Sequence, residues 1–181
     1  KWDPAYQSEV ITTYKRLTRT TIQQKPDLVI WPETATPFYF EGPNQPLTAD
    51  LRAFVRSTGT PLLFGSPTYE TKERRVLRNA AFLLDRVGMT KAVYHKIHLV
   101  PFGEYVPAKH SLLFFAGKMV QADDDFEAGA EHTLMTVGLP SGKTVTIGTV
   151  ICYEVIFPDL VRRFVNEGAT VMTTLTNDAW F

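Results

Sequence analysis

Cysteine is the residue in shortest supply in this sequence, with one copy among 181 residues. A single cysteine excludes an internal disulfide and a zinc site built from several thiolates. The sequence also lacks an excess of either charge, because 19 Lys and Arg residues balance 19 Asp and Glu residues. This balance argues against a nucleic-acid-binding surface, which would require a basic excess. No apolar run approaches the roughly 20 residues of a membrane-spanning helix, so we expect none within the chain.

The composition that remains is ordinary for a globular protein, with 44% hydrophobic and 21% charged residues. A chain of this length can bury the core of one domain. On the first expected helix, Val10, Tyr14 and Leu17 form an apolar stripe that should face inward. Helices are expected over residues 6–24, 47–58 and 155–165, and strands over residues 28–33, 61–66, 79–85, 89–96 and 145–151. This order predicts a mixed α/β fold.

Cys152 lies between a strand and a helix. The preceding run, Val145–Ile151, is rich in β-branched residues, and the helical pattern that follows contains Pro158, which a helix tolerates only in its first turn. A helix N-terminus offers unpaired N–H groups and the positive end of a dipole, both of which favour a thiolate. This position indicates a catalytic nucleophile. The alternative is that a lone cysteine serves as a small buried hydrophobic residue.

Two more strands end in charged residues. The apolar run Leu28–Pro32 leads into Glu33, and the run Ala92–His95 leads into Lys96. A charge at the end of a buried strand needs a partner or a chemical role. If the three strands share a sheet edge, Glu33, Lys96 and Cys152 place a base, a cation and a nucleophile in one crevice.

Three short motifs around these residues carry a resemblance to a known family. Trp31–Thr34, His95–Leu99 and Ile151–Glu154 resemble the segments that supply the Glu-Lys-Cys triad of the nitrilase superfamily of carbon-nitrogen hydrolases. Their order and approximate spacing also fit. The resemblance implies a four-layer αββα sandwich, of which residues 1–181 would be a part, truncated at both ends.

Within that superfamily, residues 96–107 most resemble the apolipoprotein N-acyltransferases. Soluble amidases of the superfamily usually follow the cysteine with Tyr-Asp or Trp-Asp, whereas this chain has Tyr153-Glu154. The resemblance implies transfer of a fatty acyl chain, through a thioester, from a phospholipid to the N-terminal S-diacylglyceryl-cysteine of apolipoproteins. It also implies transmembrane helices on both sides of the domain, outside this chain. We therefore expect the chain to be a fragment.

The same resemblance implies roles for six residues. Cys152 would attack the acyl carbonyl, Glu33 would take and return the proton, and Lys96 would stabilise the oxyanion together with main-chain N–H groups near Tyr153. Glu104 would position Lys96. Tyr153 and Glu154 would support the site, with Glu154 open to a purely structural role at a helix N-terminus.

Acyl transfer requires that water be excluded from the thioester, so apolar walls are expected. The candidates for substrate or lipid access are Trp2, Phe38, Phe40, Phe114 and Phe115. No cofactor and no metal are expected. His95 and His98 have a ligand-like spacing, but no third ligand is evident and Lys96 between them would repel a cation.

The expected partners are a phospholipid acyl donor, an apolipoprotein acceptor and, through regions outside this chain, the membrane; nucleic acid is not among them. The resemblance implies a bacterial inner-membrane protein whose domain faces the periplasm. Two alternatives stay open. One is a soluble amidase that uses the same triad on a small amide, and the other is a catalytically idle α/β domain in which Cys152 is merely buried.

Overall fold

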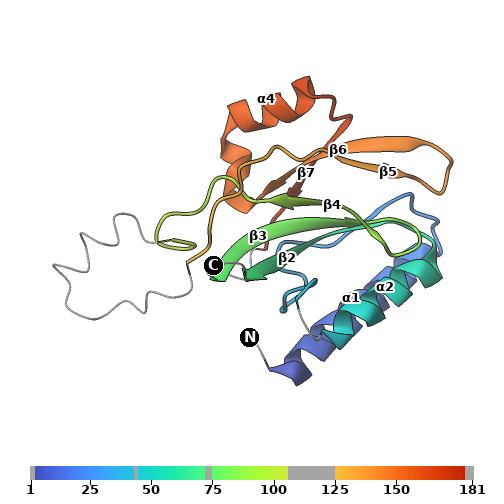
Figure 1. Cartoon of the computed structure of the whole chain (residues 1–181). Helices are drawn as coiled ribbons and strands as arrows, with labels where there is room; N and C mark the ends of the chain where they lie inside the picture. The colour runs from blue at the N-terminus through green and yellow to red at the C-terminus, as the bar shows by residue number, and fades with distance from the viewer. Residues whose placement is uncertain (1–2, 43–44, 72–74, 106–124, 178–181) are drawn as a thin grey trace.

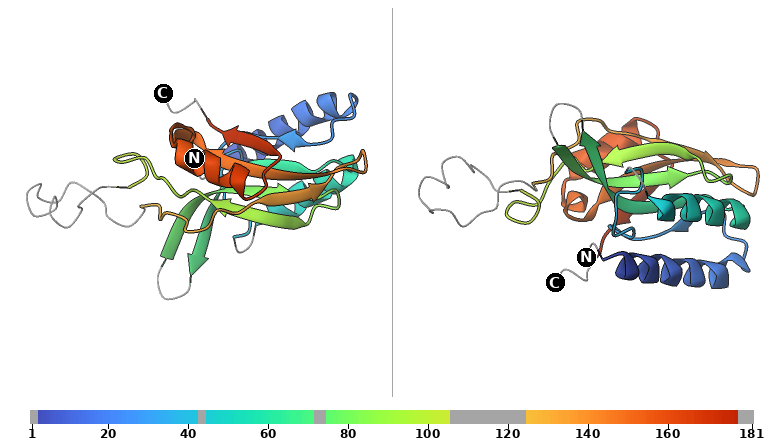
Figure 2. Two further views of the ribbon diagram at one scale, coloured as in Figure 1. Left: turned by 90° about the horizontal axis from the view of Figure 1, so that it is seen from above. Right: turned by 60° about the horizontal axis from the view of Figure 1, so that its bottom comes forward.

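The computed structural model of the chain describes residues 3–42, 45–71, 75–105 and 125–177. Two helices cover one sheet and a third helix covers a second sheet, which gives four layers (Figure 1 and Figure 2). In chain order the elements are α1 (Pro4–Ile22), β1 (Val29–Ile30), α2 (Pro46–Thr58), β2 (Leu62–Thr71), β3 (Arg75–Leu84), β4 (Thr90–His95), β5 (Met135–Gly138), β6 (Thr144–Ile151), the 3₁₀ turn η1 (Cys152–Ile156), α4 (Pro158–Asn166) and β7 (Val171–Leu175). The αββα layering predicted from the sequence is confirmed.

The first sheet has the strand order β1-β2-β3-β4, with β1 parallel to β2 and the other pairs antiparallel. The second has the order β5-β6-β7, with β5 antiparallel and β7 parallel to β6. Strand β5 was not predicted, because its alternation involves only two buried residues, Met135 and Val137, in a strand of four. In contrast, β2 and β3 are longer than predicted and pair as far as Thr71 and Arg75.

Two apolar clusters hold the layers together. In the cluster between α1, α2 and the first sheet, Phe64 and Phe82 stack on one another and Phe40 packs edge-on against both. Leu63 and Ile151 belong to the cluster that joins the two sheets and reaches α4. Because side chains alternate along a strand, neighbours such as Leu63 and Phe64 serve different clusters. The first sheet is therefore buried on both faces.

Helix α1 turns only part of the predicted stripe to the core, because Tyr14 packs against it but Leu17 does not. Leu17 is about half exposed, whereas Gln7, Ile11 and Thr18 are buried. Trp31 explains the difference, because its indole N–H donates to the Thr18 hydroxyl at 2.9 Å and its ring stacks on Tyr14. The hydrogen bond from the indole N–H of the buried Trp31 thus sets the rotation of the helix about its axis.

Helix α4 lies close to the second sheet because of one glycine. A Cβ on Gly148 would stand 2.8 Å from the Cβ of Phe164 and 2.6 Å from the sulfur of Met172. Pro158 is the first residue of α4, the position that the sequence required. The close packing fixes the turn between β6 and α4, where Cys152 lies.

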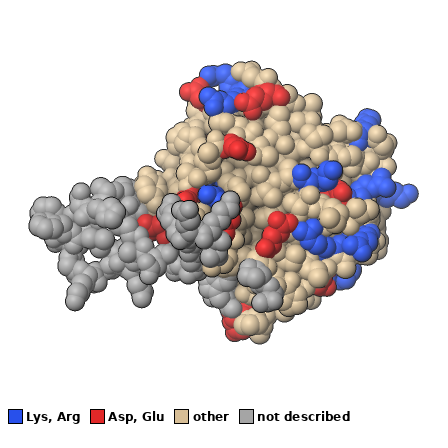
Figure 3. Space-filling view, in the orientation of Figure 1, with Lys and Arg blue, Asp and Glu red and all other residues tan. Residues whose placement is uncertain are grey.

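On the face drawn in Figure 3, acidic and basic side chains are interspersed, with a group of Lys and Arg at the right-hand end. That end is opposite the one at which β4 leads out of the sheet (Figure 1). Among the described helices, none combines the length and the apolar character that crossing a membrane requires.

Candidate active site

The ends of three strands bring Glu33, Lys96 and Cys152 together. The Lys96 ammonium lies 3.8 Å from Oε1 of Glu33, and the Cys152 thiol lies beside the Glu33 side chain. Lys96 follows the last residue of β4, Cys152 follows the last residue of β6, and Glu33 comes three residues after β1. The two sheets thus meet at one edge with a carboxyl, an ammonium and a thiol in reach of one another.

Lys96 is almost completely buried, with 1% of its side chain exposed. Its Nζ lies 2.8 Å from Oε2 of Glu104, a closer contact than the one with Glu33. A buried ammonium requires such partners, because the loss of hydration costs several kcal/mol. The contact agrees with the expectation that Glu104 positions Lys96.

Glu104 is fixed from several sides. Its Oε2 also accepts from the main-chain N–H of Val100 at 2.9 Å, and its Oε1 accepts from the Asn79 amide at 2.9 Å. The turn between Val100 and Glu104 contains Phe102 in the left-handed region, at φ 61°. Such a conformation is uncommon for a large side chain and is held here by the surrounding hydrogen bonds.

Glu33 is buried to 7% exposure, and this burial raises its pKa. The Asn79 amide, which donates to Oε1 at 2.7 Å, opposes the rise, as does the positive charge of Lys96. The negative charge of Glu104 adds to it. A carboxyl with a raised pKa is suited to proton exchange near neutral pH.

Gly65 makes room for the main chain at Glu33. A Cβ on Gly65 would lie 2.6 Å from the Glu33 Cα and 2.6 Å from the Thr34 nitrogen. Thr34 itself has a φ of 51°, so the chain turns sharply directly after Glu33. The carboxyl reaches the crevice because β2 carries no side chain at this point.

Cys152 has a φ of 51°, in the left-handed region that a residue with a Cβ seldom occupies. Its thiol is free and partly exposed. The residue opens the 3₁₀ turn η1, and α4 begins only at Pro158. The predicted strand-to-helix position is therefore present, but the helix that follows directly is a single short turn. Strained residues of this kind concentrate at functional sites.

Glu154 is completely buried and joins the two strand ends. Its Oε1 accepts from the Tyr94 hydroxyl at 2.8 Å and from the N–H groups of Ile97 and His98 at 2.7 and 3.0 Å. Its Oε2 accepts from the N–H of Ile151 at 2.7 Å. Burial, followed by the charge of Glu154, raises the pKa of Tyr94, which stays a hydroxyl donor. Glu154 thus ties the segment after Lys96 to the turn that carries Cys152.

The remaining predicted residues fall into three groups. Tyr153 is 36% exposed and packs edge-on against Phe157. Phe38 and Phe40 are completely buried in the cluster beneath α1 and α2, so the prediction that they line an access path is wrong. An aromatic triplet in a turn-rich segment suggested an exposed wall, but these rings fill the core. Trp2, Phe114 and Phe115 lie outside the described residues.

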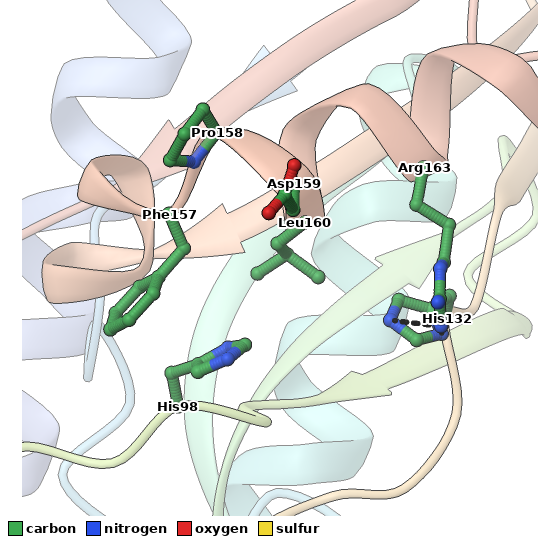
Figure 4. A pocket seen from close by; sticks show the side chains of 7 residues that line it. All are labelled: His98, His132, Phe157, Pro158, Asp159, Leu160 and Arg163. Carbon is green, nitrogen blue, oxygen red and sulfur yellow. Dashed lines mark hydrogen bonds between the residues drawn. The ribbon is translucent and has the colours of Figure 1, made fainter.

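A hollow of about 350 Å³ adjoins the site between the segment after Lys96 and the start of α4 (Figure 4). The ring of His98 stacks on Phe157 at 4.1 Å along its wall. None of the three predicted catalytic residues lines it. Within the described part of the chain, no three His, Cys, Asp or Glu side chains are grouped so as to hold a metal ion.

Sequence reasoning missed Asn79 and Gly65. Asn79 stands directly before the apolar run Ala80–Leu84, and an amide at the start of a buried strand was the available signal. Gly65 interrupts an apolar strand, and glycine at such a place often marks the close approach of another backbone. Neither signal identifies the residues that Asn79 and Gly65 contact, which lie 25 to 46 positions away in the sequence.

Sequence relatives cover the whole chain. It is 42% identical over 184 residues to a Geobacter metallireducens protein named apolipoprotein N-acyltransferase, and 33% identical over 199 residues to one of the same name from Chlorobaculum tepidum. The two matches cover 100% of this chain, whereas they cover only 34% and 37% of the respective relatives. The chain thus spans about a third of the length of the curated relatives it matches.

Solved structures share the fold. A carbon-nitrogen hydrolase from Helicobacter pylori G27 superposes with a TM-score of 0.67 at 17% identity, over 94% of this chain and 55% of that one. An amidase from Nesterenkonia sp. AN1, with the acetamide moiety of fluoroacetamide added covalently at its active-site cysteine, gives 0.63 at 20% identity, over 98% and 62%. The family model for carbon-nitrogen hydrolases matches residues 3–181. The chain belongs to the carbon-nitrogen hydrolase family.

Proposed function

We propose that this chain carries the catalytic centre of an apolipoprotein N-acyltransferase. The observation that carries the proposal is the grouping of Glu33, Lys96 and Cys152 at the edge where the two sheets meet, with Glu104 against Lys96. The names of the bacterial relatives support this substrate class over a small amide.

In the first half of the proposed reaction, the Cys152 sulfur attacks the ester carbonyl of a phospholipid, and the thiol proton passes to Glu33. Lys96 and main-chain N–H groups near Tyr153 stabilise the negative charge that develops on the carbonyl oxygen. The C–O bond then breaks, Glu33 returns the proton to the departing oxygen, and the lysophospholipid leaves. The acyl chain remains on Cys152 as a thioester.

In the second half, the free α-amino group of an S-diacylglyceryl-cysteine attacks the thioester carbonyl. The amine gives up a proton to Glu33, the C–S bond breaks, and the proton passes to the sulfur. An amide forms and the Cys152 thiol is regenerated. The raised pKa of Glu33 supports both steps, because one carboxyl must accept a proton and return it at the same pH.

Cellular location is part of the same proposal. Membrane anchorage is assigned to segments beyond residues 1–181, because both substrates carry acyl chains. The proposed site of action is the bacterial inner membrane, with this domain on the periplasmic side, and the relatives support the bacterial setting.

Intact-protein mass spectrometry tests the proposal. The complete protein that contains this chain is incubated in detergent with phosphatidylethanolamine, beside a Cys152→Ala variant. We expect a fatty-acyl mass increment on the wild-type protein alone, discharged by a diacylglyceryl-cysteinyl peptide. No increment, together with hydrolysis of a small soluble amide, would replace the acyltransferase with the amidase alternative.

A further inference from the structure

Asn79, in the middle of β3, is in contact with Glu33, Glu104 and Lys96. It is 6% exposed. Its side-chain nitrogen donates to Oε1 of Glu33 at 2.7 Å and to Oε1 of Glu104 at 2.9 Å. Its main-chain carbonyl accepts from the N–H of Lys96 at 2.8 Å. One residue of β3 therefore connects the two carboxylates and the strand end that carries the ammonium.

The two carboxylates fix the orientation of the Asn79 amide. An amide nitrogen carries two hydrogens, and here each is directed to one carboxylate. The reversed orientation would turn the carbonyl oxygen toward two negative groups. In the observed orientation, Oδ1 is buried without a hydrogen-bond partner among the described residues. A buried acceptor without a donor is unfavourable, so the two hydrogen bonds that the nitrogen donates must outweigh this cost.

The contacts also distinguish the two oxygens of Glu33. Asn79 and Lys96 both approach Oε1, at 2.7 and 3.8 Å. Oε2 is the oxygen that neither of these contacts engages. Lys96 is drawn to Glu104 at 2.8 Å, so Asn79 is the nearer partner of the Glu33 carboxyl.

We propose that Asn79 is a positioning residue, which holds Glu33 and Glu104 around Lys96 and reserves Oε2 of Glu33 for the proton of Cys152. The inference rests on the proposed role of Glu33 as general base. Asn79 touches none of the reacting atoms; it acts through the carboxyl that does.

This role has a consequence for pH dependence. The charged or titratable groups that face the Glu33 carboxyl are Lys96, Glu104 and Cys152. Burial raises the pKa of Glu33, and the Asn79 hydrogen bond lowers it. Without that bond the pKa rises further, and Glu33 is ionised only at a higher pH. An Asp at position 79 adds a like charge and moves the pKa in the same direction by more.

The test follows alkylation of Cys152 by iodoacetamide from pH 4 to pH 9, by intact mass, in the complete protein. For Asn79→Asp we expect the acid limb of the rate profile to move up by about one pH unit or more, with at least about a tenfold loss of rate near neutral pH. For Asn79→Ala the limb moves in the same direction by less. Asn166→Asp, at the exposed end of α4, is the matched control and should leave the profile unchanged.

Thermal unfolding of each variant checks that the alkylation rates are compared between folded proteins. Slower alkylation with an acid limb at the wild-type pH in both Asn79 variants would reduce the residue to a structural role and overturn the inference. Iodoacetamide is neither a phospholipid nor an apolipoprotein. A shifted limb in a protein that fails to transfer acyl chains would therefore support the role of Asn79 while rejecting the acyltransferase.

Discussion

The two sheets hold their parts of the candidate site by different physical means. At the first sheet, Glu33 and Lys96 are buried, Glu104 is partly buried, and the three restrain one another through charge and through Asn79. On the second sheet, Cys152 is partly exposed and its position is set by the main chain, with a φ of 51°. The positions of the two carboxyls and the ammonium thus depend on charge. The position of the thiol depends on the path of the backbone.

Replacing Lys96 by Met should best distinguish the restraint by charge at the first sheet from the restraint by the main chain at the second. The variant keeps the approximate size of the side chain but leaves Glu33 and Glu104 without their cation. We expect about a hundredfold or greater loss of thioester formation and about 3–5 kcal/mol of lost stability at neutral pH. The pKa of Glu33 rises further without Lys96, so the stability deficit should shrink as the carboxyls take up protons at low pH.

Chemical denaturation at pH 5 and pH 8 checks this expectation. Lys15→Met is a control of the same chemical type, because Lys15 of α1 pairs with Asp50 of α2, whose side chain is half exposed. An equal deficit at both pH values in Lys96→Met would show that packing, rather than charge, holds the first-sheet residues.

Replacing Glu154 by Gln should disturb the second-sheet half. Glutamine replaces one of the two acceptor oxygens by an N–H₂ group, which cannot accept a hydrogen bond. In one orientation of the amide the bond from Ile151 is lost; in the other, the bonds from Tyr94, Ile97 and His98 are lost. We expect about 2–3 kcal/mol of lost stability, since hydrogen bonds to a charged group are broken. Urea denaturation measures it, with Glu9→Gln on the exposed face of α1 as control. If both variants unfold at the same urea concentration, the backbone of the turn does not depend on Glu154.

Replacing Gly65 by Ala should move Glu33 without changing any charge. The added Cβ would meet main-chain atoms of Glu33 and Thr34 at 2.6 Å. We expect about 1–3 kcal/mol of lost stability and slower Cys152 alkylation. Gly138→Ala is the matched control, because its Cβ would point into open space in β5. Wild-type alkylation in Gly65→Ala would mean that the Glu33 position tolerates a shifted backbone.

Replacing Glu33 by Gln should have the smallest effect on the fold. Burial raises the pKa of Glu33 in the folded protein above its value in the unfolded chain. At pH values above the unfolded pKa the buried carboxyl therefore lowers the stability of the fold, and at lower pH, where it is protonated in both states, this cost disappears. The neutral amide removes that cost, and its carbonyl can still accept from Asn79. We expect thioester formation to stop while the variant is slightly more stable than the wild type at pH 8. The advantage should fade toward pH 4 in thermal unfolding, and a variant less stable at pH 8 would contradict this.

The sequence predicted the strand ends better than the contacts between them. Glu33, Lys96 and Cys152 could be found because each ends an apolar run, a local pattern that physical reasoning interprets directly. Asn79 could not be assigned, because its partners Glu33 and Glu104 are distant in sequence and only the paired strands bring them together. The inward face of α1 was partly misjudged for the same reason, since it depends on a hydrogen bond from Trp31.

The aromatic segment after Glu33 shows a second limit. Phe38 and Phe40 follow turn residues, so their hydrophobicity suggested a wall near the crevice, yet both rings fill the core under α1 and α2. Hydrophobicity predicts burial but does not say against which layer a side chain packs. In a sandwich with two separate apolar clusters, that choice is made by long-range packing.

The hydrogen bonds of Glu154 have a consequence for protein engineering. The carboxylate recognises only the main-chain N–H groups of Ile97 and His98, so it places no demand on the side chains there. A library randomised at these two positions could vary the surroundings of Lys96, including the wall of the neighbouring hollow at His98. The main-chain hydrogen bonds to Glu154, which hold the backbone after Lys96, would remain. Residues 97 and 98 are therefore positions at which the side chain could be varied while the hydrogen bonds to Glu154 are kept.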